Sequence, residues 1–498
     1  MKFFKSVHAA AALTGFFSPK DLDTKNHTSI RLVASTLAHD TMAYYTGNAS
    51  EAKSVDVGNV PKPYYWWVAG ALWGAMLDYY HMTGDASYND VVLQALTAPT
   101  NLGKGLDYMP AEHASEEGND DLFFWGSAVM AAAERNFPQP DDKLPSWLDM
   151  AVNVFNSLIS RWNTADCGGG MLWQIYASNP NGMTYKNSVS NGGLFQLAAR
   201  LARATGNDTY LHWAQQAWDW TAKRGLIDHD NYHVYDGVDI RTGCSEVNHL
   251  SFTYTSGIFL YGASVLANHT RDPVWADRAS RLLDGTEWFF QPDEPGRGIM
   301  YEAACETVDK CNYDMVTFKG YLSRFMWQST VMQPALRDRV AKILEPSARA
   351  AAATCTGGDD GRQCGMRWWK GSFDDRAGLG SQMCALETIQ GLLVADSDPP
   401  LSGKDIRRVR DRSWLHRDTK AEHLAPFGVG PESQKPTSTT TTADVAPTDD
   451  DESSDKKSEN DARRLGIDDG IVRLIVSFVA GCAIGGLIRT MGWPLHGR

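Results

Sequence analysis

The chain has 498 residues, of which 43% are hydrophobic and 21% are charged, a composition typical of a globular protein with a large core. Its formal net charge of −13 at pH 7 argues against nucleic-acid binding. It holds 17 Trp, 18 Tyr and 18 Phe, several in polar-flanked clusters that suit stacking against sugar rings as well as core packing.

The start of the chain indicates secretion. Residues 1–5 are basic and lead into an apolar stretch over 7–17, so we expect residues 1–18 to be a signal peptide. Asn-x-Ser/Thr sequons, which are acceptors for N-glycosylation in secreted proteins, agree with this expectation. They begin at Asn26, Asn48, Asn207 and Asn268.

Residues 19–396 show helical periodicity and almost no strand-like alternation, so we expect one all-α domain. Twelve helices are predicted, at 28–45, 64–82, 86–97, 120–134, 146–162, 187–204, 208–223, 252–268, 274–289, 314–330, 334–351 and 376–395. Short joints such as Thr83-Gly84-Asp85 and Thr205-Gly206-Asn207 link several of them, with Gly in the left-handed cap that ends a helix. Six helical hairpins are what an (α/α)6 barrel requires, although the joints alone would also allow an open solenoid.

Two adjacent carboxylates, Asp120 and Asp121, open the predicted helix 120–134. Glycoside cleavage uses one carboxylate at the sugar carbon and a second carboxylic acid that protonates the departing oxygen, about 5 Å apart in retaining enzymes. Neighbouring side chains at a helix start can reach that separation. The structural alternative is that Asn119 caps the helix and both acids only complement its dipole. The surrounding aromatic residues favour the chemical interpretation.

Eight Cys residues without any C-x-x-C spacing are expected to form several disulfides in an oxidising compartment. Candidate pairs are Cys167–Cys244, Cys305–Cys311 and Cys355–Cys364. Cys384 stands in a helical pattern and is expected to be a free core thiol, whereas Cys482 belongs to the C-terminal tail.

From residue 397 the composition changes. Residues 397–470 contain Pro399-Pro400, a Ser/Thr run and an acidic cluster, so they are expected to be a disordered stalk. The tail 471–498 has an apolar run over 474–488, shorter than the roughly 20 residues of a comfortable spanning helix. With Asn460 as candidate attachment site, this layout matches a GPI-anchor signal, and a retained tail anchor is the alternative. Either one would place the protein at the cell surface, on the plasma membrane or in the cell wall.

Five segments, in consistent order along the chain, are similar to a known enzyme family. They are Tyr64-Tyr65-Trp66-Trp67-Val68-Ala69-Gly70, Gly118-Asn119-Asp120-Asp121, Cys167-Gly168-Gly169-Gly170, Lys186-Asn187-Ser188-Val189-Ser190-Asn191-Gly192 and Phe318-Lys319-Gly320-Tyr321-Leu322-Ser323-Arg324. Together they resemble glycoside hydrolase family 76, and within it the fungal cell-wall mannosidases, over about residues 22–394.

The resemblance implies an (α/α)6 barrel that cleaves α-1,6-mannosidic bonds inside a chain and retains the anomeric configuration. Asp120 would be the nucleophile and Asp121 the general acid/base, with no metal and no cofactor. The fungal members further imply transglycosylation from α-1,6-mannan or a GPI-core glycan onto β-glucan. We expect a monomer.

The helix N-terminus is expected to lower the pKa of Asp120, while burial and the neighbouring charge keep Asp121 protonated. Candidate sugar-binding residues, each of which could instead be a core or capping residue, are Trp66, Trp67, Asn119, Trp125, Trp173, Gln174, Asn187 and Asp236. Lys319 and Arg324 could be interhelix salt-bridge partners. One departure is Leu172, because the fungal pattern usually has Arg there, and this puts the glycan preference in question.

Motifs of other catalytic classes, such as H-E-x-x-H, G-x-S-x-G and the P-loop, are missing from the sequence. Two alternatives stay open. The chain could be a wall-bound mannan-binding protein whose acids only cap a helix. It could also be an inverting glycosidase, in which Asp121 pairs with a remote carboxylate such as Asp236.

Overall fold

The computed structural model describes residues 16–179 and 182–408. The chain divides into two compact units, 1–431 and 432–498, and all described residues belong to the first. Most of the expected signal peptide, the stalk beyond residue 408 and the tail with Asn460 and Cys482 lie outside the described residues. Within the described ranges, no helix has the length and apolar character needed to cross a membrane.

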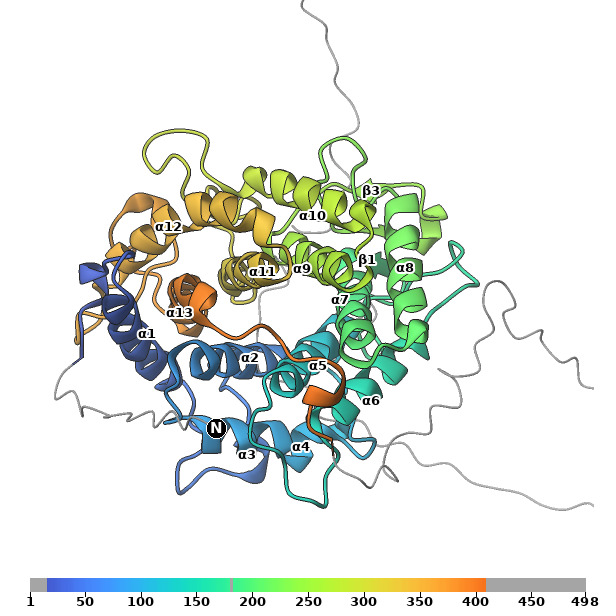
Figure 1. Ribbon diagram of the computed structural model, residues 1–498, viewed down its shortest axis with the longest axis horizontal. Coiled ribbons are helices and arrows are strands. Elements are labelled where there is room, and N and C mark those ends of the chain that lie inside the picture. Colours follow the sequence, from blue (N-terminus) through green and yellow to red (C-terminus); the bar gives the residue numbers. More distant parts are fainter. Residues whose placement is uncertain (1–15, 180–181, 409–498) are drawn as a thin grey trace, which may run out of the picture. The chain divides into compact units, whose positions relative to one another are not determined.

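Long helices alternate between an inner and an outer ring (Figure 1). The inner helices are α2 (Trp66–Thr83), α5 (Asn119–Glu134), α7 (Ser188–Thr205), α9 (Thr253–Thr270), α11 (Phe318–Met332) and α13 (Leu379–Gln390). The outer helices are α1 (His27–Met42), α3 (Asn89–Thr97), α6 (Trp147–Ile159), α8 (Asp208–Lys223), α10 (Pro273–Gly285) and α12 (Arg337–Thr354). Each inner helix contacts the next, and α13 contacts α2, which closes the ring. The predicted (α/α)6 barrel is confirmed, and the open solenoid is excluded.

The chain also forms short elements that the sequence did not predict. Helix α4 (Pro99–Leu102) is a single turn. Strands β1 (Tyr185–Asn187), β2 (Gly237–Asp239) and β3 (Val247–Asn248) form an antiparallel sheet in the order β1-β2-β3. Strands of this length are too short to show an alternating pattern.

Two joints have the predicted geometry. Gly84 after α2 and Gly206 after α7 take left-handed φ angles of 77° and 70°. The side chain of Asn207 then caps α8. Arg271 takes the same conformation after α9, at φ 61°, which costs a non-glycine residue about 1–2 kcal/mol. Such turns reverse the chain, so the inner helices all begin at one end of the barrel and the outer helices finish there.

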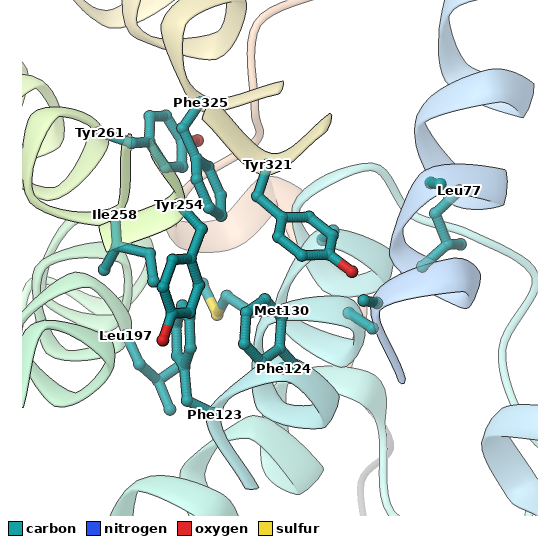
Figure 2. Close-up of a cluster of buried hydrophobic side chains, with 14 of the residues drawn as sticks. Leu77, Phe123, Phe124, Met130, Leu197, Tyr254, Ile258, Tyr261, Tyr321 and Phe325 are labelled. Carbon is teal, nitrogen blue, oxygen red and sulfur yellow. The ribbon is translucent and has the colours of Figure 1, made fainter. Parts of the chain in front are cut away.

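Large side chains fill the centre of the inner ring. Figure 2 shows them converging from α2, α5, α7, α9 and α11, and they are Leu77, Phe123, Phe124, Met130, Leu197, Tyr254, Ile258, Tyr261, Tyr321 and Phe325. The rings of Tyr261 and Phe325 stack with centroids 5.8 Å apart. The inner ring therefore encloses a packed core. Burying one such side chain contributes about 1.5–3 kcal/mol to stability.

Buried ion pairs connect the inner helices. Arg324 of α11 pairs with Glu387 of α13, and its Nε lies 3.4 Å from Asp78 of α2. The interhelix role expected for Arg324 is therefore observed. Lys319 instead pairs at 2.5 Å with Glu306, which lies in the loop between α10 and α11.

The structure contains disulfides at the pairs that the sequence suggested, Cys167–Cys244, Cys305–Cys311 and Cys355–Cys364. Cys384 is buried and free. Its Sγ accepts a hydrogen bond from the Gly320 amide at 3.1 Å, and burial raises its pKa to about 12. A thiol in this state is unreactive and acts as a core residue.

The sequon asparagines differ in their contacts. Asn26 and Asn207 use Oδ1 to cap α1 and α8, and Asn48 lies exposed in a turn. Asn268 donates its Nδ2 to the Met332 carbonyl at 3.1 Å. A glycan would be attached to this same nitrogen and would replace one of its two hydrogens. Use of all four sequons stays a prediction.

Residues 397–408 run across the end of the barrel where the inner helices finish. The Leu401 amide donates to the Glu134 carbonyl at 2.7 Å, and Arg203 donates to the carbonyls of Pro400 and Leu401. Ile406 is buried. The packed chain therefore extends past the expected boundary at residue 396, because hydrogen bonds to helix ends fix a segment whose Pro-rich composition suggests a linker.

We predict that a chain ending at residue 396 is less stable than one ending at residue 408. The shorter chain loses these hydrogen bonds and the burial of Ile406, together worth on the order of 3 kcal/mol. Urea unfolding followed by Trp fluorescence measures the difference. The chain ending at residue 408 is the control, and equal unfolding midpoints for the two would contradict the prediction.

Candidate active site

Side chains from the starts of several inner helices meet at one end of the barrel. The indole of Trp67, on α2, donates to Oδ1 of Asp314, just before α11, at 3.1 Å. Tyr254, at the start of α9, stacks on Phe318 with ring centroids 3.8 Å apart. Burial raises the pKa of the Tyr254 hydroxyl, and the charges of Asp120 and Asp314 raise it further. Carboxylates and aromatic rings are thus gathered around the start of α5.

Residues 118–121, here named the acid turn, place two carboxylates against the backbone. Oδ2 of Asp121 accepts a hydrogen bond from the Gly118 amide at 2.6 Å. A Cβ on residue 118 would lie 2.4 Å from Oδ1 of Asp120 and 3.1 Å from Oδ2 of Asp121, so any larger residue here would displace the two carboxylates. Asp120 as a whole is half-buried, and its Oδ1 is buried without a hydrogen-bond partner in the described structure.

Asn119 fixes the acid turn to residues 166–176, here named the glycine loop. Its backbone amide donates to the Trp173 carbonyl at 2.9 Å, and its Nδ2 donates to the Leu172 carbonyl at 2.8 Å. Its Oδ1 accepts from Nε of Arg161 at 2.7 Å. Leu172, which stands where the fungal pattern usually has Arg, contacts Asn119 through its backbone carbonyl. The guanidinium that reaches the acid turn belongs to Arg161. The amide of Asn119, expected to bind sugar, is used for these structural contacts.

A buried ammonium holds the glycine loop. Nζ of Lys186 donates hydrogen bonds to three backbone carbonyls, those of Asn163, Asp166 and Gly169, at 3.1, 2.7 and 2.6 Å. Burial lowers the pKa of Lys186 to about 8. The disulfide Cys167–Cys244 ties the same loop to the segment between β2 and β3. The loop that carries Trp173 is therefore braced from two sides.

Burial changes the proton affinity of both acids. It raises the pKa of Asp120 to about 7, although hydrogen bonds from the first-turn amides and the Trp173 side chain act in the opposite direction. It raises the pKa of Asp121 further, and the charge of Asp120 adds to that shift. The expected lowering for Asp120 is wrong, because the loss of solvation outweighs the helix amides. The expected order holds, with Asp121 the more strongly protonated acid.

Two further carboxylates near the acid turn were missed in the sequence. Burial raises the pKa of Asp314 to about 6, and the charge of Asp314 raises the pKa of both Asp120 and Asp121. Glu117 is buried beside the acid turn, and burial raises its pKa to about 8. Adjacency could have identified Glu117. No local signal identifies Asp314, because its partner Trp67 lies 247 residues away in sequence.

Of the candidate sugar-binding residues, Trp67, Trp173 and Asp236 lie at the site. Trp173 is half-buried, and the hydrogen bond from its side chain lowers the pKa of Asp120. Oδ2 of Asp236 accepts from the Tyr185 hydroxyl at 2.6 Å and from Nδ2 of the exposed Asn248 at 3.0 Å. The charge of Asp236 also raises the pKa of Tyr254, whose pKa the charges of Asp120 and Asp314 raise as well.

The other candidates make structural contacts, and sugar binding by them stays a prediction. Trp66 and Trp125 stack on each other with centroids 5.1 Å apart and are 3% and 0% exposed. Asn187 is buried and caps α7 with its side chain. Oε1 of Gln174 accepts a hydrogen bond from Asn179 at 3.1 Å. Residue type alone could not separate these side chains from those at the site, because helix register decides which ones point inward.

The site suits proton transfer to a neutral ligand. It offers two neighbouring acids of unequal proton affinity, with aromatic rings beside them. Across residues 16–179 and 182–408, no group of three or more His, Cys, Asp or Glu side chains is placed to hold a metal ion.

Comparison of the sequence finds close relatives. The model of glycosyl hydrolase family 76 matches residues 29–404. Mannan endo-1,6-alpha-mannosidase DCW1 of Eremothecium gossypii is 42% identical over 412 residues, which cover 82% of this chain and 89% of the relative. Mannan endo-1,6-alpha-mannosidase DFG5 of Saccharomyces cerevisiae is 41% identical, over 80% of this chain and 83% of the relative.

Comparison of the structure finds the same barrel. The crystal structure of Dfg5 from Chaetomium thermophilum in complex with glucosamine has a TM-score of 0.75 and 37% identity, and covers 81% of this chain and 99% of that chain. The α-1,6-mannanase of a Salegentibacter species, at a TM-score of 0.57 and 20% identity, shares the fold. The family match, the relatives above 40% identity and the shared barrel together show that this chain belongs to glycosyl hydrolase family 76.

Proposed function

We propose that this glycoside hydrolase cleaves α-1,6-mannosidic bonds within a mannan chain, with retention, and transfers the bound glycan to a sugar hydroxyl. The observation that carries the proposal is the placement of half-buried Asp120 and buried Asp121 side by side in the first turn of α5, where Oδ2 of Asp121 accepts from the Gly118 amide at 2.6 Å. Relatives that span most of the chain are named mannan endo-1,6-alpha-mannosidase, which supports the choice of bond.

In the first step, the carboxylate of Asp120 attacks the anomeric carbon and the glycosidic C–O bond breaks. Asp121 gives its proton to the departing oxygen, which leaves as an alcohol. The products are a glycosyl ester on Asp120 and the carboxylate of Asp121. Because the ester is neutral, it no longer repels that carboxylate.

In the second step, Asp121 removes the proton of an incoming hydroxyl as its oxygen attacks the anomeric carbon. The carboxylate of Asp120 leaves, and the two displacements together restore the original configuration. Water as the acceptor gives hydrolysis, and a sugar hydroxyl gives transfer. The proposed donor is α-1,6-mannan or a GPI-core glycan and the proposed acceptor is β-glucan. The protein would act as a monomer held at the cell surface by its C-terminal anchor, a setting supported by the resemblance to fungal cell-wall enzymes.

We predict that Asp120→Asn lowers kcat on α-1,6-mannan by about a thousandfold or more, because an amide is a poor nucleophile. The amide keeps the size of the carboxylate, so the unfolding midpoint and the affinity for mannan should stay near those of the parent. Reducing-end release and isothermal titration measure the two properties. Undiminished turnover would refute the assignment of Asp120 as nucleophile.

We predict that Asp314→Asn moves the acidic limb of the kcat/KM profile to lower pH by about half to one pH unit. The charge of Asp314 raises the pKa of Asp120, so its removal favours the ionised nucleophile at lower pH. The amide oxygen of Asn can still accept from the Trp67 indole. Asp277→Asn, on the exposed side of outer helix α10, is the matched control. An unmoved acidic limb in Asp314→Asn would contradict this coupling.

The proposed function is tested with the full-length protein, α-1,6-mannan as donor and laminari-oligosaccharides as acceptor. We expect both shorter mannans and mannosylated laminari-oligosaccharides, with the α-anomer formed first by NMR. A β-anomer would favour the inverting alternative. Glycan binding without release or transfer of any product would favour the mannan-binding alternative.

A further inference from the structure

A row of aromatic side chains begins beside the Asp236–Asn248 contact and ends at an exposed Trp. Nδ2 of Asn248 donates to Oδ2 of Asp236 at 3.0 Å. The next residue is His249, whose ring centroid lies 4.4 Å from that of Tyr235. His233 follows, with its ring 6.5 Å from Tyr235 and 5.5 Å from Trp288. Trp288 is 54% exposed. We name His233, Tyr235, His249 and Trp288 the aromatic row.

The aromatic row lies at the same end of the barrel as the acid turn. His233 and Tyr235 stand between α8 and β2, and His249 follows β3. Trp288 lies in the short helix η6 (Thr286–Phe289), directly after α10. Because α8 and α10 run opposite to the inner helices, their last residues lie where α5 begins.

Local contacts hold the loops of the aromatic row in place. The Tyr235 hydroxyl donates to Oδ2 of Asp228 at 3.1 Å. The guanidinium of Arg281, on α10, lies 4.1 Å from the centroid of the Tyr232 ring. A surface fixed in this way before a ligand arrives loses little conformational entropy on binding.

The chemistry of the row fits a neutral sugar. Ring faces pack well against the C–H faces of a pyranose, and His and Tyr supply polar groups for its hydroxyls. The donor of an endo-acting enzyme extends to both sides of the bond that is cut, so sugar units beyond the reacting one need binding surface near the site. The contact of Asn248 with Asp236 connects the aromatic row to that neighbourhood.

We propose that the aromatic row is a further subsite, in which Trp288 stacks on a pyranose unit of the α-1,6-mannan donor away from the cleaved bond. This inference rests on the proposed function. The aromatic row would bind mannose units of the donor beyond the one that reacts. The affinity of the protein for mannan would therefore depend on the length of the mannan.

The test measures binding, so that it does not depend on turnover. Full-length Asp120→Asn is the parent, and Trp288→Ala, Trp288→Phe and Val274→Ala are added to it. Val274 is a matched control because it is 50% exposed at the opposite end of α10. Isothermal titration with α-1,6-mannohexaose, α-1,6-mannobiose and laminarihexaose gives each Kd.

We expect Trp288→Ala to weaken α-1,6-mannohexaose binding about tenfold, Trp288→Phe to restore part of it and Val274→Ala to change nothing. Binding of α-1,6-mannobiose should be equal in all variants. Equal hexaose affinity for parent and Trp288→Ala overturns the inference, as does a parent that binds no mannohexaose. A loss confined to laminarihexaose also overturns it and assigns the row to the acceptor. A wild-type chain that binds mannohexaose through Trp288 but releases no product would instead contradict the proposed function alone.

Discussion

The fixed position of Asn119 is the constraint on which the candidate site depends. Three hydrogen bonds, from its amide, to its Oδ1 and from its Nδ2, connect the first turn of α5 to the glycine loop and to Arg161. A helix start normally frays and is open to water. Here it is covered, so the two acids beside Asn119 lose solvation, and that loss is the largest cause of their raised pKa values. The chemistry of the pair therefore follows from a packing contact of their neighbour.

Buried charged side chains have different neighbours inside the ring and at the start of α5. Inside the ring, Arg200 pairs with Glu134 at 2.7 Å and Arg324 pairs with Glu387, so each charge has a compensating partner. At the start of α5 the acids are close to other acids, Asp314 among them. Ion pairs such as Arg324–Glu387 favour one arrangement of the helices. Carboxylates that lie close together away from water instead favour the protonated form of one of them. The second situation is the one that acid–base chemistry uses.

Most of the fold could be predicted from the sequence, and only part of the site. Apolar periodicity located the helices, and the Gly84 and Gly206 joints gave the reversals that make hairpins. The neighbours Trp66 and Trp67 show why the site residues could not all be predicted. Trp66 stacks in the core on Trp125, whereas the indole of Trp67 donates to Asp314. Their direction depends on helix register against distant partners. The sign of the pKa shift of Asp120 was missed for the same reason, since solvation is set by contacts that no local pattern records.

The clamp formed by Lys186 has a consequence for how the glycine loop is maintained. Loops rich in glycine and backbone carbonyls are often organised by a bound cation such as calcium. In this chain the positive group that gathers the carbonyls of residues 163, 166 and 169 is carried by the polypeptide itself. The cation that organises the loop is thus covalently part of the domain and reaches its place when the domain folds.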